Sequence, residues 1–157
     1  MIEHFTGSFT QQEPLSEEAI AAATAVMRHG RLHRYNTEEG EQSEVALLEQ
    51  EFAAFTGAKY CLALASGGVA ITTALRALGV STGDNVLTNA FTLAPVPGAI
   101  AAVGAVPVFV EVTDGLVIDL GDLAGKLGAA KVLLLSHMRG HICDMDRLMQ
   151  ICDAAGV

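Results

Sequence analysis

The clearest chemical signal in the chain is the short run Ser66-Gly67-Gly68. It follows an apolar run, residues 60–65, and precedes a segment of small and apolar residues, 71–78. That order predicts a strand, a tight turn and a helix. Backbone N–H groups at such a turn, together with the positive end of the helix dipole, favour a bound phosphate group. The alternative for the same pattern is a plain strand-to-helix turn.

The surrounding residues predict the elements that position this turn. Two helices come first, with Ser16 as the N-cap of one and Gly57 as the end of the other. Strands and helices then alternate, which predicts an α/β fold: a three-layer sandwich with a mostly parallel sheet. The expected strands are residues 59–65, 85–88, 106–112 and 131–135, and the expected helices are 17–28, 41–56, 69–78, 95–103, 120–127 and 145–155.

Three polar residues each follow one of these expected strands. They are Ser66, Thr92 and His137. Ligands of parallel sheets bind beyond the carboxyl ends of the strands, so these residues are predicted to share one cleft. We interpret residues 1–40 as an N-terminal helix and irregular arm, and residues 41–157 as an α/β domain.

Composition narrows the choice of partners. The chain has 157 residues, of which 51% are hydrophobic, and a formal net charge of −9. Such a charge argues against nucleic acid and anionic membranes as partners. Residues 86–110 carry no charge, but prolines and glycines divide them into pieces shorter than a membrane-spanning helix. A small-molecule ligand remains compatible, because backbone N–H groups bind phosphate without Lys or Arg.

Cysteine content and the N-terminus predict the compartment. Cys61, Cys143 and Cys152 form no CxxC pair, and an odd number of cysteines favours reduced thiols. Residues 1–4 are polar and acidic, unlike a secretory signal. We therefore expect a cytoplasmic protein.

A further group of residues with possible ligand chemistry lies after the last expected strand. His137, His141, Cys143 and Asp144 superficially resemble metal ligands, but no second cluster accompanies them, so no metal is expected. Arg139 either holds an anionic substrate group or is simply solvated, and the sequence leaves both open.

From about residue 30 onward, the ordered motifs resemble the DegT/DnrJ/EryC1/StrS family of pyridoxal-phosphate-dependent, fold-type I aminotransferases. Many members of that family act on keto-sugars linked to nucleotides. No single motif is specific, but the ordered set covers roughly four-fifths of the chain. The matching stretches are Gly30-Arg31, 47–52, 57–60, 66–70, 75–80, 83–87, Phe91-Thr92, 104–112, 137–140 and 144–146.

The resemblance implies roles for particular residues. Ser66, Gly67 and Gly68 would bind the phosphate of pyridoxal phosphate, although the family usually has Thr or Ser where this chain has Gly68. Leu93 stands where the family has an aromatic residue that stacks on the pyridine ring. Thr92 would contribute substrate contacts.

The loop after the last expected strand would contribute further substrate contacts, from His137 and Arg139. The resemblance also implies a homodimer.

Two groups that pyridoxal chemistry needs have no counterpart in the chain. These are the Schiff-base lysine and the carboxylate at the pyridine nitrogen. Lys59, Lys126 and Lys131 do not match the lysine position, so no catalytic residue is assigned. Three explanations remain: a fragment of a longer enzyme, one half of an enzyme completed by a companion chain, or a stand-alone remnant.

The activity that the resemblance implies for the parent enzyme is transamination, from glutamate or glutamine to a keto-sugar. The alternatives are a pyridoxal-phosphate-dependent sugar dehydratase and a non-catalytic interaction domain.

Overall fold

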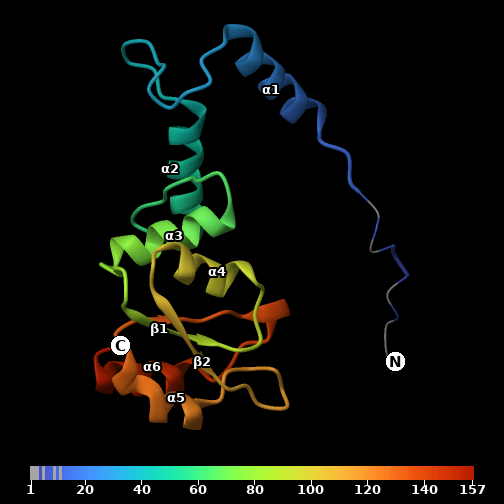
Figure 1. Ribbon diagram of the computed structural model, residues 1–157. Helices are drawn as coiled ribbons and strands as arrows, with labels where there is room; N and C mark the ends of the chain where they lie inside the picture. The colour runs from blue at the N-terminus through green and yellow to red at the C-terminus, as the bar shows by residue number, and fades with distance from the viewer. Residues whose placement is uncertain (1–3, 5, 9, 11) are drawn as a thin grey trace. The chain divides into compact units, whose positions relative to one another are not determined.

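The computed structural model describes residues 4, 6–8, 10 and 12–157, in two compact units, 1–63 and 64–157. The division expected after residue 40 stays a prediction. Residues 1–3, which belong to the polar N-terminus that is unlike a secretory signal, lie outside the described residues. The elements, shown in Figure 1, are α1 (Glu17–His29), α2 (Glu44–Thr56), α3 (Gly67–Ala77), β1 (Asn85–Asn89), α4 (Pro95–Ala102), β2 (Val106–Val110), α5 (Leu120–Lys126), η1 (Leu127–Ala129), β3 (Leu133–Leu134), η2 (Met138–Gly140) and α6 (Met145–Ala155).

Serine caps and glycine stops define both helices of the first unit. The Ser16 side chain accepts a hydrogen bond from the Ala19 N–H, and α1 ends at Gly30 in the left-handed conformation. In α2 the capping residue is Ser43, so the helix begins three residues later than expected. It ends at Gly57, as predicted.

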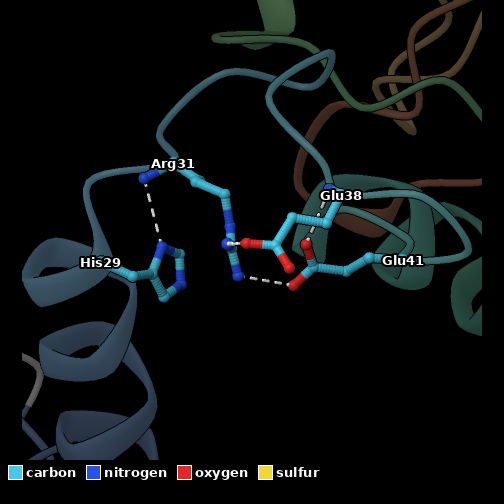
Figure 2. Close-up of polar contacts among 4 residues, drawn as sticks. All are labelled: His29, Arg31, Glu38 and Glu41. Atoms are coloured by element: carbon cyan, nitrogen blue, oxygen red, sulfur yellow. Dashed lines mark hydrogen bonds and ion pairs between the residues drawn. The ribbon is translucent and has the colours of Figure 1, made fainter.

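An arginine organises the segment between these helices. The Arg31 guanidinium binds Glu38 at 2.6 Å and Glu41 at 2.8 Å, as Figure 2 shows. The Arg31 backbone N–H donates to Nδ1 of His29. A second oxygen of Glu41 accepts the Glu38 N–H. These contacts give a defined conformation to a polar stretch whose sequence predicts only irregular structure.

Residues 59–65 do not form the expected strand. A strand exists only through hydrogen bonds to a neighbouring strand, and the described sheet pairs β1 with β2 and β3 alone. The Ala63 N–H donates instead to Oε1 of Glu49, at 2.7 Å. The prediction was wrong because an apolar run shows a preference for extended backbone but does not show whether a partner strand is present.

The second unit is a three-layer α/β sandwich. Its sheet has the order β2-β1-β3, and both pairings are parallel. Val86 packs in a cluster with residues of α3 and α4, whereas the next residue, Leu87, packs with residues of α5 and α6. Figure 1 shows the two helix pairs on opposite faces of the sheet. The predicted fold class is therefore confirmed.

Two strands are shorter than the sequence predicts. β3 contains only Leu133 and Leu134, and β2 ends at Val110. Val112 forms an isolated antiparallel bridge with Ile118, which turns the chain away from the sheet. None of the described helices has the length and apolar character needed to cross a membrane.

Candidate phosphate and substrate site

The first turn of α3 presents two unpaired backbone donors. Ser66 is the N-cap residue, and its Oγ accepts the Val69 N–H at 3.2 Å. The Ser66 carbonyl accepts the Ala70 N–H at 2.9 Å. Among the described residues, no acceptor pairs with the N–H groups of Gly67 and Gly68, and the first turn contains no acidic side chain. The positive end of the helix dipole is therefore free to attract an anion.

Open space surrounds these donors. A Cβ added at Gly67 would meet no other heavy atom within 4 Å, and one at Gly68 would come no closer than 3.9 Å to Ser66 Oγ. Neither glycine has a positive φ, so the backbone conformation does not require glycine here. Both belong to α3, which begins at Gly67 rather than at Val69 as predicted. The turn fits a phosphate group, because its donors are accessible and unobstructed.

The start of α3 lies at the edge of the sheet where β1 and β3 end. In Figure 1, α3 runs back over the sheet in the opposite direction to β1. The far end of α3 agrees with this direction, since Leu78 lines a pocket with Asn85 and Lys131, at the amino ends of β1 and β3. The loop after β1 carries Thr92 and Leu93, and the segment after β3 carries His137 and Arg139.

A side chain that the sequence analysis did not single out joins these two segments. Asn89, the last residue of β1, is only 1% exposed. Its Nδ2 donates to the Phe91 carbonyl at 2.9 Å and to the Ser136 carbonyl at 3.1 Å. Its Oδ1 accepts the Ser136 N–H at 2.9 Å. A carboxamide at the end of a buried strand, after Val86, Leu87 and Thr88, is the sequence signal that could have identified it.

Thr92 and Leu93 occupy positions suited to ligand contact. The Thr92 hydroxyl is buried and has no hydrogen-bond partner in the described part of the chain. A buried hydroxyl without a partner is costly, so an additional group near it would be stabilising. Leu93 is apolar yet 58% exposed. An exposed aliphatic side chain at this edge can cover the face of a planar ligand.

His137 and Arg139 lie on the loop that follows β3, and both are exposed. Arg139 has φ 54° and ψ 27°, a left-handed conformation that is uncommon for a residue with a side chain. The loop is closed by hydrogen bonds from the Gly140 N–H to the His137 carbonyl and from the His141 N–H to the Met138 carbonyl. Within the described residues, Arg139 makes no ion pair, so its guanidinium is available to an anionic group.

Neighbouring thiols offer no competing chemistry. Burial raises the pKa of both the Cys143 and the Cys152 thiol, which keeps them protonated at neutral pH. In the residues that the structure describes, no three His, Cys, Asp or Glu side chains gather closely enough to hold a metal ion.

Comparison with known proteins decides the family. A model of the DegT/DnrJ/EryC1/StrS aminotransferase family matches residues 14–157. The chain belongs to the DegT/DnrJ/EryC1/StrS aminotransferase family. The resemblance seen in the sequence motifs is confirmed over more of the chain than the motifs themselves cover.

Similarity to individual proteins supports this family assignment. The chain is 33% identical to GDP-perosamine synthase from Vibrio cholerae, over 69% of this chain and 30% of that protein. It is 32% identical to UDP-2-acetamido-2-deoxy-3-oxo-D-glucuronate aminotransferase from Pseudomonas aeruginosa, over 94% of this chain and 40% of that protein. The chain thus spans well under half the length of these relatives.

Similarity to a solved structure supports the assignment of the cofactor. The pyridoxal-phosphate form of Spr1654 from Streptococcus pneumoniae superimposes with a TM-score of 0.77 and 27% identity, over 88% of this chain and 34% of that one. Together with the aminotransferase family, it indicates pyridoxal phosphate as the cofactor, as predicted.

Proposed function

We propose that this chain forms the cofactor-phosphate site and part of the substrate pocket of an aminotransferase that acts on a nucleotide-linked keto-sugar. The observation that carries the proposal is the start of α3, where the N–H groups of Gly67 and Gly68 are free, unobstructed and not opposed by an acidic side chain. The sugar-nucleotide names of two relatives in the same family support the substrate class.

Different residues of this chain would contact different parts of pyridoxal phosphate. Gly67 and Gly68 would hold the phosphate through backbone N–H groups, and Ser66 would keep the helix start in place. Leu93 would cover the pyridine ring. Bound pyridoxal phosphate supplies the electron sink that lets an amino group pass from a donor, glutamate or glutamine, to the keto-sugar.

The loop that follows β3 would meet the substrate. His137 and Arg139 would contact it there, together with Thr92 from the loop after β1. The exposed Arg139 guanidinium suits a negatively charged group of a sugar nucleotide.

The Schiff-base lysine would come from outside these 157 residues. Lys126 is already bound to the Phe109 carbonyl and to Asp122. Lys131 lies at the amino end of β3, the opposite edge from the candidate site. Lys59 belongs to the other compact unit, where its Nζ lies over the Tyr60 ring. The proposal therefore includes a lysine supplied by further sequence or by a companion chain.

Substitution of Gly67 tests the phosphate site. In the intact protein isolated from its source, Gly67→Val should weaken the binding of both pyridoxal phosphate and inorganic phosphate. Loss of one hydrogen bond to a charged group is worth about 1.5–3 kcal/mol, which corresponds to at least about tenfold in the dissociation constant. The fold should tolerate the substitution, since an added Cβ meets no heavy atom within 4 Å.

Gly125→Val is the matched control. Gly125 also lies in a helix, α5, with no heavy atom within 4 Å of an added Cβ. This helix packs through Leu123 on the opposite face of the sheet from α3. The Gly125 variant should bind both ligands as the wild type does. Equal affinity of the Gly67 and Gly125 variants for pyridoxal phosphate, measured by absorbance titration, would show that the phosphate site is assigned to the wrong residues.

A further inference from the structure

Beyond the last backbone pair of β1 and β3, the Asn89 side chain supplies the hydrogen bonds between the two segments. On one side of β1, the backbone ladder continues to the Ala90 N–H, which donates to the Val110 carbonyl. On the other side, the register with β3 ends at the pair Thr88 and Leu134. Beyond that pair, the Asn89 carboxamide accepts the N–H of Ser136 and donates to its carbonyl. The side chain therefore acts as one more rung between the two segments.

The same carboxamide also fixes the start of the loop after β1. Its second Nδ2 hydrogen bond goes to the Phe91 carbonyl, one residue before Thr92. Both N–H donors of the carboxamide are thus used, one for the loop after β1 and one for the segment after β3. Because Asn89 is 1% exposed, removal of its side chain would leave the Ser136 N–H and the two carbonyls without these partners at a buried position, which is costly.

We propose that Asn89 is a positioning residue that holds the two ligand-facing loops, residues 90–94 and 136–141, in a fixed relation to each other. The inference rests on the proposed function, since Leu93 on the first loop would cover the cofactor ring and His137 on the second would contact the substrate. Asn89 touches neither ligand, and it acts only through the loops that it joins.

The phosphate site does not depend on Asn89. The start of α3 is held by its own bonds, from the Val69 N–H to Ser66 Oγ and from the Ala70 N–H to the Ser66 carbonyl. Loss of the Asn89 carboxamide should therefore weaken contacts to the ring of pyridoxal phosphate and leave contacts to its phosphate group intact. Inorganic phosphate, which has no ring, separates the two effects.

Asn85 provides a matched control on the same strand. It lies at the amino end of β1, and its Nδ2 donates one hydrogen bond to the Ala129 carbonyl, at 3.0 Å. Asn85→Ala therefore removes an amide contact between two segments at the opposite edge of the sheet. A merely structural role of Asn89 would give the two variants the same pattern of ligand binding.

The test measures dissociation constants for pyridoxal phosphate and inorganic phosphate in the intact protein isolated from its source. Asn89→Ala should weaken the binding of pyridoxal phosphate by about tenfold, because the ligand must then order two loops that the carboxamide no longer joins, and should change the binding of inorganic phosphate by less than about twofold. Asn85→Ala should change neither. The proposal is overturned if Asn89→Ala loses affinity for both ligands to the same extent. It is also overturned if Asn89→Ala binds pyridoxal phosphate as tightly as Asn85→Ala does.

Amide hydrogen exchange tests the coupling of the loops without any ligand. Asn89→Ala should accelerate exchange in residues 90–94 and 136–141 together, and leave residues 66–70 unchanged. Unchanged exchange in either loop would overturn the coupling. If Asn89→Ala does not fold, Asn89→Ser, which retains one hydroxyl donor, takes its place in both experiments. Wild-type protein that binds neither ligand would refute the proposed function, whereas the exchange result would still decide whether Asn89 couples the loops.

Discussion

Glu49 joins three parts of the N-terminal unit through a single carboxylate. From its position in α2, it forms a two-pronged contact with the Arg34 guanidinium, at 2.6 and 2.9 Å. One of its oxygens also accepts the Ala63 N–H. The hydrogen bond from Arg34, followed by that from Ala63, lowers the pKa of the Glu49 carboxyl. The charged carboxylate therefore stabilises the conformations of residues 31–43 and 58–63.

The lowered pKa of Glu49 predicts a dependence of stability on pH. A carboxyl group whose pKa is lower in the folded state stabilises the fold above its unfolded pKa, about 4.3 for glutamate, and loses this contribution as the pH falls through the folded value. Glu49→Gln should reduce stability at pH 7 by more than it does at pH 3. Urea denaturation at the two pH values measures the effect.

Glu51→Gln is the control for this experiment. Glu51 is exposed on the same helix, and the described residues include no hydrogen-bond partner for its side chain. Its replacement should leave the urea midpoint unchanged at both pH values. A Glu49 variant that loses as much stability between pH 7 and pH 3 as the wild type would contradict the role given to the carboxylate.

Single residues also show what the sequence can and cannot predict about the site. The turn at Ser66, Gly67 and Gly68 could be predicted because capping and glycine preferences act locally, and its role in binding phosphate stays a prediction. Asn89 was not identified, because its partner Ser136 is 47 positions away and only the folded sheet brings the two together. The departures at Gly68 and Leu93 were visible only against a family pattern.

At the scale of elements, helices were predicted more accurately than strands. Local caps determine where a helix begins and ends, and α1 and α6 agree with the expected ranges to within a residue or so. A strand also needs a neighbour. Residues 59–65 have none in the described sheet, and β3 shortens to two residues where Asn89 replaces the backbone ladder. Strand errors therefore arise from partners that are distant in sequence.

For the whole molecule, we propose that the protein works as a homodimer. Exposed apolar side chains in the second unit, such as Leu78 at 67% and Ile142 at 64%, are consistent with a covered surface. Intact mass spectrometry would give the mass of the chain as isolated, and sedimentation velocity at about 0.15 M salt, where charge repulsion is screened, would give the mass of the assembly. The mass of the assembly should be about twice the mass of the chain. A single species whose mass equals that of one chain would contradict a dimer.

A crystal structure of the isolated protein with pyridoxal phosphate would show whether the start of α3 binds the phosphate group of this cofactor. We expect phosphate oxygens within hydrogen-bond distance of the Gly67 and Gly68 N–H groups, with Leu93 against the pyridine ring. A cofactor whose phosphate is bound at any other place in the molecule would contradict this assignment of the phosphate site.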